Sequence, residues 1–259
     1  RSFDFPTEEE WSNTDYDLIM NKYKEAFANP GDFNLFFVGN IEEDKFLEYV
    51  QTYLASLSDS DRKDKIVDLG IRPPKGTHEK IYKKGVDQKS SVRISFSGEI
   101  NYDKKEKYYL SALGEILTIK LIEIMREEKG GVYGVGARGG MSKYPYENYS
   151  FSISFPCGPE NVQELKDAAL AELKKIIDNG PEEKDLKKIK ESQRKDLKEQ
   201  LKQNGYWLNT LEAVSFMKSE LPTSQELEDR IEKLTVKDIQ NVGKKYLTGD
   251  YIVGILMPE

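Results

Sequence analysis

The sequence predicts an α+β fold in which helices pack on one face of a largely antiparallel mixed sheet. Two features of the chain lead to this prediction. Short apolar segments with strand character come in adjacent pairs, and consecutive strands joined by short connections usually pair antiparallel. Long amphipathic segments separate these pairs, and their apolar stripes need a sheet face to cover.

The first elements are a helix over residues 15–28, a buried strand at Phe33–Val38 and a second helix over 42–57. Both helical segments carry apolar side chains at the helical period, and Asn29-Pro30-Gly31 ends the first of them. The strand is a continuous apolar and aromatic run, which is typical of a strand covered on both faces.

The middle of the chain predicts two pairs of strands with a long helix between them. Residues 79–84 and 91–97 form the first pair, and apolar residues alternate with polar ones in the second of these segments. A helix over 103–128 follows, because its apolar side chains recur every three or four residues. Strands at 132–140 and 148–155 complete the second pair.

The last part of the chain is mostly helical. An amphipathic helix over 160–179 ends at a glycine, helices fill most of the chain after Pro181, and Tyr251–Met257 is a final apolar strand. We expect the helices over 103–128 and 160–179 to cover one face of the sheet. The predicted sheet carries Phe33–Val38, Val92–Phe96, Val132–Gly140, Tyr149–Phe155 and Tyr251–Met257.

We expect residues 1–259 to form a single domain. Because the chain begins at Arg1 rather than Met, we also expect it to be a piece of a longer protein. The parts of the domain are an N-terminal arm over 1–14, the helix–strand–helix opening over 15–57, a surface loop over 58–77 and the remaining sheet and helices over 78–259.

Charge and hydropathy exclude two classes of protein. The net charge is −7, whereas nucleic-acid-binding proteins normally present a basic surface, so we expect no nucleic-acid partner. No apolar run reaches 18 residues, so no segment is predicted to span a membrane. The single cysteine, Cys157, forms no disulfide within the chain, and we expect it to be a small buried or half-buried thiol at a strand end.

The residue types that most often carry catalysis are scarce. The single histidine is His78, and Tyr82 stands where a second zinc-binding histidine would follow His78-Glu79. A catalytic zinc needs about three protein ligands, so we expect no zinc site in this chain. A carboxylate-rich magnesium site stays open as an alternative, although no cluster of Asp or Glu stands out, and we name no metal ligand. No Gly-x-Ser-x-Gly sequence is present to form a nucleophile elbow.

Residues 126–140 are the most informative stretch and read Arg-Glu-Glu-Lys-Gly-Gly-Val-Tyr-Gly-Val-Gly-Ala-Arg-Gly-Gly. Arg126 and Tyr133 flank the turn from helix to strand. A guanidinium and a phenol beside an unobstructed strand edge can bind the carbonyl groups of an extended peptide. The alternative is structural, with Arg126 as a cation at the end of the helix dipole and Tyr133 as a half-buried strand residue.

Gly134–Gly139 matches the dinucleotide-binding fingerprint in its spacing. That motif must open a helix, so that helix amides meet the pyrophosphate, whereas here a helix precedes it and a strand contains it. Two other interpretations stay open. Either the glycines let another chain approach the backbone closely, or they relieve the packing of a twisted strand.

Three segments of the chain resemble the C-terminal half of zinc peptidases of the pitrilysin/insulinase family, M16. Phe36–Ile41 is similar to the strand, glycine, asparagine and helix sequence of that family, and Leu121–Tyr133 resembles its Leu-Arg-Glu-x-x-Gly-x-x-Tyr segment. Asn204–Leu208 resembles a segment of bacterial PqqL-type members. The order and spacing of the three segments carry the resemblance.

The resemblance implies a fold of the LuxS/MPP-like metallohydrolase type and a peptidase of two related halves that enclose a chamber. One half carries an inverted His-x-x-Glu-His zinc motif, which this chain lacks. By motif position, Arg126 and Tyr133 would bind the substrate and support the transition state, with Gly130 and Gly131 beside them. No residue of this chain is expected to be a zinc ligand or a catalytic base.

The resemblance also implies the partners. Zinc is expected in an N-terminal half, on the same or a companion polypeptide, with peptides as substrates. The isolated chain is expected to be inactive, and its role is that of the substrate-binding half of a zinc metalloendopeptidase. The alternative is a catalytically inactive M16-like scaffold or subunit. The bacterial members suggest a periplasmic location.

Overall fold

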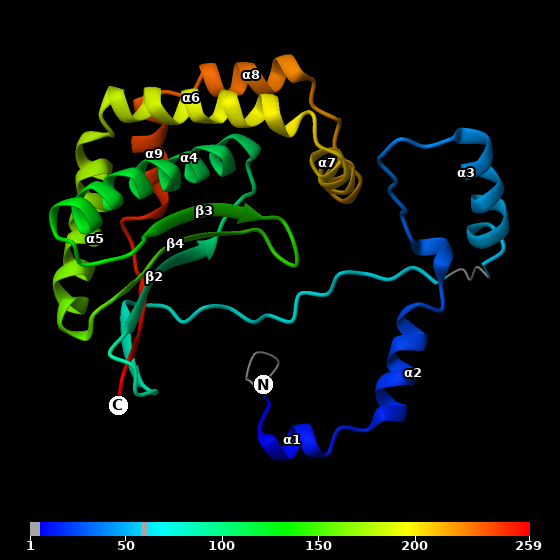
Figure 1. Ribbon diagram of the computed structural model, residues 1–259, viewed down its shortest axis with the longest axis horizontal. Coiled ribbons are helices and arrows are strands. Elements are labelled where there is room, and N and C mark those ends of the chain that lie inside the picture. Colours follow the sequence, from blue (N-terminus) through cyan, green and yellow to red (C-terminus); the bar gives the residue numbers. More distant parts are fainter. Residues whose placement is uncertain (1–5, 58–61) are drawn as a thin grey trace. The chain divides into compact units, whose positions relative to one another are not determined.

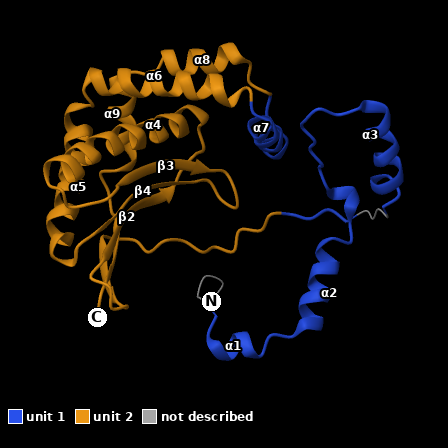
Figure 2. Cartoon of the chain, viewed as in Figure 1, with its two compact units in different colours: residues 1–65, 203–220 blue, residues 66–202, 221–259 orange. Residues whose placement is uncertain are grey.

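The computed structural model describes residues 6–57 and 62–259, which form two compact units (Figure 2). Unit 1 consists of residues 1–65 and 203–220, and unit 2 of residues 66–202 and 221–259. Parts of the predicted arm and loop, at 1–5 and 58–61, lie outside the described residues. The assignment of the whole chain to one domain stays a prediction.

Unit 1 is helical wherever its described residues have regular structure. Side-chain caps start two of the helices: Thr7 forms a reciprocal capping box with Glu10, and Asp15 accepts a hydrogen bond from the backbone N–H of Leu18. The elements are α1 (Glu8–Ser12), α2 (Tyr16–Ala26), a 3₁₀ turn η1 (Pro30–Asp32), α3 (Glu43–Tyr49), a π-helical turn η2 (Val50–Leu54) and α7 (Asn204–Met217).

The predicted buried strand at Phe33–Val38 is wrong. This segment has no strand pairing, and Phe33, Leu35 and Phe37 are between 41% and 52% exposed. All strands of the described residues belong to unit 2, so the described part of unit 1 offers the segment no neighbouring strand. Composition alone does not make a strand, because a strand also needs a backbone partner for its N–H and C=O groups.

The sheet of unit 2 has five strands in the order β1-β5-β2-β4-β3. Its β1–β5 pair is parallel and the other three pairs are antiparallel, which confirms the largely antiparallel mixed sheet. β1, rather than the 33–38 segment, is the fifth strand. The expected pairing of 79–84 with 91–97 is wrong, because β5 lies between β1 and β2 and pairs with both. The strands are β1 (His78–Lys83), β2 (Ser90–Glu99), β3 (Gly136–Ser142), β4 (Asn148–Cys157) and β5 (Ile252–Met257).

Helices pack on one face of this sheet, as predicted, with α4, α5 and α9 on the same side of the strands (Figure 1). α6 packs on α4, and α8 packs on α6. The core between the layers contains Ile94, Leu113, Leu117, Phe151 and Ile153, all fully buried. The helices are α4 (Lys104–Leu121), a π-helical turn η3 (Ile122–Glu128), a 3₁₀ turn η4 (Pro159–Asn161), α5 (Val162–Asn179), α6 (Glu183–Gln200), α8 (Ser224–Glu232) and α9 (Val236–Tyr246).

β3 begins later than the sequence predicts. The strand expected to start at residue 132 starts at Gly136, so residues 129–135 form a connection between η3 and β3. Cys157 is a buried free thiol at the last residue of β4, which confirms its predicted place. Burial raises the pKa of this thiol, and the nearby charge of Glu160 adds to that effect.

Candidate functional site

The contact between α4 and β3 fixes one end of the connection that carries Tyr133, whereas Arg126 lies just before this connection, in η3. The hydroxyl of Thr118 donates a hydrogen bond to the carbonyl oxygen of Gly114 at 2.8 Å and accepts one from the backbone N–H of Ala137 at 2.8 Å. A Cβ at Gly114 would lie 2.9 Å from the carbonyl oxygen of Ala137. Only a glycine at this position lets the helix approach the strand so closely.

The N-terminal end of the connection is fixed where η3 ends. Met125 is fully buried, and its carbonyl oxygen accepts a hydrogen bond from the N–H of Gly131 at 3.0 Å. Gly130 has φ +61°, a left-handed conformation that favours glycine. A Cβ at Gly131 would lie 3.0 Å from Leu165 of α5, so the chain lies directly on that helix.

Arg126, in η3, and Tyr133, in the connection, are both exposed, and Tyr133 is 96% exposed. Tyr133 therefore lies in the connection, not within a strand as expected. Among the residues that the structure describes, none forms an ion pair or side-chain hydrogen bond with either of them. The interpretation of Tyr133 as a half-buried packing residue is wrong, and its hydroxyl is free to meet a ligand.

The glycines of 134–140 fall into two groups, so both open interpretations apply, each to different residues. A Cβ at Gly139 would overlap the carbonyl oxygen of Leu110 and the ring of Phe151, so this glycine serves helix–sheet packing. Gly134, Gly136 and Gly140 have nothing within 4 Å of a Cβ position. β3 is an edge strand, and Gly136 and Gly140 leave its surface unobstructed, as Gly134 does for the connection before it.

A hollow of about 460 Å³ lies beside this connection on the face of the sheet that the helices leave open. Gly134 and Gly136 form part of its wall, which joins it to the segment that carries Tyr133. The two charged residues of the lining, Arg93 and Arg138, were not predicted as functional residues. The alternation in 91–97 already placed Arg93 on the outer face, whereas Arg138 was hidden inside the glycine motif.

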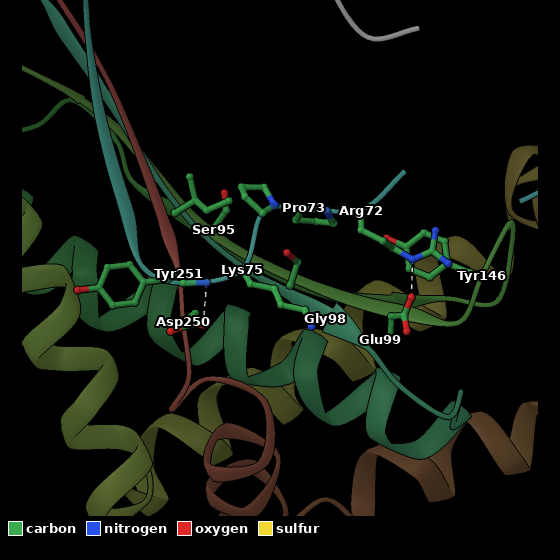
Figure 3. Close-up of a pocket in the computed structure, with 13 residues that line it drawn as sticks. Arg72, Pro73, Lys75, Ser95, Gly98, Glu99, Tyr146, Asp250 and Tyr251 are labelled. Atoms are coloured by element: carbon green, nitrogen blue, oxygen red, sulfur yellow. Dashed lines mark hydrogen bonds and ion pairs between the residues drawn. The ribbon is translucent and has the colours of Figure 1, made fainter. Parts of the chain in front are cut away.

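A second cavity, of about 430 Å³, lies where residues 72–76 cross the same face of the sheet near β2 and β5 (Figure 3). Arg72 holds this crossing in place. It pairs with Glu99 of β2, lies 2.6 Å from the carboxylate of Asp68 and stacks 3.5 Å above the ring of Tyr146. The Arg72 guanidinium and the N–H of Gly70 lower the pKa of Asp68 to about 2.

The described part of the chain has no group of three or more His, Cys, Asp or Glu side chains arranged to hold a metal ion. His78 is the first residue of β1, and its Nε2 lies 2.7 Å from the carbonyl oxygen of Lys75. The donor set needed for zinc does not come together around it. In the same residues, no helix is long and apolar enough to cross a membrane.

Comparison with known proteins adds a family match. The model of the family described as "Peptidase M16 inactive domain" matches residues 19–193. The match includes Arg126, Tyr133 and the whole connection between η3 and β3.

Individual relatives and structures agree with this match. The "Probable zinc protease PqqL" of Haemophilus influenzae is 28% identical over 174 residues, which are 67% of this chain and 18% of that protein. A crystal structure of a Helicobacter pylori protease has a TM-score of 0.80 at 18% identity, over 97% of this chain and 61% of that one. The periplasmic protease PqqL of Escherichia coli has a TM-score of 0.69 at 21% identity, over 85% and 25% respectively.

The chain spans about a fifth of the length of the curated relatives that it matches, between 18% and 26%. The structural likenesses, at 18% and 21% identity, concern the fold. They agree with the M16-type fold that the resemblance implied.

Proposed function

The chain belongs to the peptidase M16 inactive-domain family, and we propose that it is the substrate-binding, zinc-free half of a zinc metalloendopeptidase. Its companion is a zinc-bearing half, on the same or another polypeptide, and its substrates are peptides cleaved in the chamber between the halves. The curated relatives are named as zinc proteases, whereas this chain has a single histidine and no described metal-ligand cluster. The isolated chain is accordingly inactive.

The observation that carries the proposal is the anchored connection between η3 and β3. Met125, Gly131 and Val132 fix it to the core, while Arg126 and Tyr133 stay exposed and unpaired within the described residues. Groups that bind a ligand with precision need a rigid support and free donors, and this segment has both. A merely structural arginine at the helix end would need neither the exposed tyrosine nor the open glycine edge beside it.

The roles of the two residues follow from their chemistry. The guanidinium of Arg126 has several N–H donors in a fixed planar arrangement. Two of them can bind one peptide carbonyl or carboxylate group at the same time. The hydroxyl of Tyr133 donates to an oxygen that gains negative charge during peptide hydrolysis. Such a donor strengthens its hydrogen bond in the transition state and so raises the rate. Zinc in the companion half would polarise the scissile carbonyl and activate a water molecule.

The edge of β3 supplies a place for the peptide backbone. An extended peptide can add to an exposed strand edge through main-chain hydrogen bonds. Gly134, Gly136 and Gly140 leave room for that approach, since nothing lies within 4 Å of their Cβ positions. We place the protein in the periplasm, because the E. coli PqqL structure that it resembles is a periplasmic protease.

The test is the kinetics of the complete peptidase that contains this chain. Tyr133→Phe removes one hydroxyl and should lower kcat and kcat/KM together by about 100-fold, the size of effect seen when one transition-state donor is lost. Arg126→Ala should lower them further, because it removes a charged donor with several N–H groups. Tyr53→Phe, at a 66% exposed tyrosine of unit 1, is the matched control.

Zinc content and circular dichroism establish that each variant is folded and loaded. A rise in KM with kcat unchanged would mean that the two residues only hold the substrate. Unchanged kinetics in both variants would return them to the structural roles of a helix-end cation and a surface aromatic. If the complete protein carries no His-x-x-Glu-His motif and cleaves no peptide, the alternative of an inactive scaffold or subunit replaces the proposal.

A further inference from the structure

We propose that the open face of the sheet beside Tyr133 is a subsite for an acidic residue of the peptide substrate. The inference rests on the proposed function and adds to it a preference for a carboxylate at one substrate position. The site is the hollow of about 460 Å³ between β2, β3 and β4, with Arg93 and Arg138 as its charged groups.

Alternation along the strands separates the two faces of the sheet. In β2 the side chains of Val92 and Ile94 are fully buried against the helices, so Arg93 and Ser95 project from the opposite face. In β4 the buried Phe151, Ile153 and Phe155 alternate with Ser152 and Ser154, which lie on that same open face. β3 follows the same rule: Ala137 is buried and Arg138 is exposed.

Strand register then places the open-face residues in two neighbouring rows across the sheet. Because strands in a sheet lie about 4.8 Å apart, Arg93 and Arg138 are two strands, or roughly 10 Å, apart across the sheet. The first row reads Lys80, Gly254, Arg93, Ser154, Gly136, and the second reads His78, Ile252, Ser95, Ser152, Arg138.

The charge of these rows is one-sided. They contain two arginines and a lysine but no aspartate or glutamate, although the whole chain carries a net charge of −7. Within the described residues, Arg93, Arg138 and Lys80 form no ion pair. The nearest side-chain partner of Arg93 is the hydroxyl of Ser95, at 3.4 Å from Nε. The cations are thus not neutralised by the chain itself.

A carboxylate is the ligand that this chemistry fits best. Arginine binds carboxylates through two parallel N–H groups, and the hydroxyls of Ser152 and Ser154 in the lining supply further donors. The two rows are two residues apart along each strand, or about 6.8 Å. Alternate side chains of an extended peptide have the same spacing. A peptide that lies along β3 would therefore direct side chains from one side of its backbone toward this face.

Phosphate groups of a nucleic acid would also attract arginine, but the observations favour a peptide. The hollow shares Gly134 and Gly136 with the edge that accepts a peptide backbone. It also lacks the exposed aromatic side chains on which bases stack, since its lining holds glycines, serines, a valine, a proline and the two arginines.

The experiment measures binding and cleavage by the complete protein that contains this chain. Two peptide series differ only by Glu or Gln at one position, which is moved along the sequence. At one position the Glu peptide should have a kcat/KM and an affinity about five- to tenfold higher, as expected for a partly exposed charge pair with two arginines. Raising the ionic strength should reduce this ratio, because salt screens exposed charges.

The variant R93Q/R138Q should bring the Glu-to-Gln ratio close to one. Arg194→Gln on α6, which removes one positive charge from unit 2 where R93Q/R138Q removes two, should leave the ratio unchanged. Circular dichroism establishes that the variants are folded.

The outcomes separate this inference from the proposed function. Cleavage of both series with no preference for Glu at any position would contradict the acidic subsite and leave the proposed function intact. A preference that survives R93Q/R138Q would place the selectivity elsewhere and also overturn the inference. If neither series binds, the substrate-binding function fails and the subsite fails with it. Binding of short oligonucleotides that compete with the Glu peptide would show that the face recognises phosphate instead.

Discussion

The two faces of the five-stranded sheet are built from the same strands and have opposite character. On the helix side, β2 contributes Val92, Ile94 and Phe96, which are at most 2% exposed. On the other side, the same strand contributes Arg93 and Ser95, which face the hollow and the second cavity. One face is a packed apolar layer, whereas the other offers hydroxyls and unpaired cations.

The contrast between the faces separates two demands on the sequence. Residues of the covered face are constrained by stability, whereas residues of the open face can serve binding. Burial of a large apolar side chain contributes about 1.5–3 kcal/mol to folding, so the covered face determines whether the sheet forms. Exposed serines and arginines contribute little to that free energy. Because they are not needed for folding, their one-sided charge points to a role in recognition.

The largest expected effect tests the covered face. Phe151→Ala removes a fully buried ring that packs edge-on against Phe96, with ring centroids 6.5 Å apart. It should lower the free energy of unfolding by about 3–5 kcal/mol through lost burial and the cavity left behind. Ser152→Ala, one residue along on the open face, should change it by less than about 0.5 kcal/mol.

Urea unfolding followed by circular dichroism measures both variants. Equal losses in Phe151→Ala and Ser152→Ala would mean that the open face is as important for folding as the covered one. That result would remove the contrast between the faces.

A matched pair of glycines gives an intermediate effect. Gly139→Ala would drive a methyl group into the carbonyl oxygen of Leu110 and should cost about 1–3 kcal/mol, because the helix must move off the strand. Gly140→Ala has no atom within 4 Å of the new Cβ and should be neutral or slightly stabilising. The same unfolding measurement applies. A larger loss in Gly140→Ala would indicate that the faces of β3 are assigned the wrong way round.

The smallest effect concerns the part of the open face that residues 72–76 cross. The pKa of Asp68 is about 2, down from 3.8, chiefly because Arg72 donates to its carboxylate. A lowered carboxyl pKa means that the contact is favourable above pH 3.8 and is lost as the pH falls toward 2. Acidification in that range should therefore loosen the crossing first, with β2–β4 unaffected.

An NMR titration of the Asp68 carboxyl group measures this directly. The midpoint should lie near 2 in the wild-type chain and move upward, toward 3.8, in Arg72→Gln. A midpoint that does not respond to Arg72→Gln would show that Arg72 does not hold the crossing and that this end of the face is as open as the rest.

Most elements of unit 2 could be predicted from the sequence because their patterns agree with their surroundings. The helical period of 103–128 and the alternation of 91–97 each correspond to one buried face in the structure. Phe33–Val38 could not be predicted in the same way. Its composition is that of a strand, but pairing depends on a neighbour that is distant in the sequence and does not lie among the described residues of unit 1.

The candidate site was predictable in part, for a similar reason. Arg126 and Tyr133 lie in one short segment, so spacing and family resemblance were enough to find them. Arg93 and Arg138 are 45 residues apart in number and meet one hollow only because β2 and β3 both pair with β4. No local sequence pattern predicts this strand register. The sequence therefore shows where each arginine lies along the chain but not that the two share one surface.

The division of the chain into two units also distributes its natural optical and chemical reporters. Both tryptophans, Trp11 and Trp207, lie in unit 1, whereas the single thiol, Cys157, lies in unit 2 at the end of β4. Selectively excited tryptophan fluorescence thus follows the first unit, and labelling of the thiol follows opening of the second. The unmodified chain can report on the two units separately in one sample.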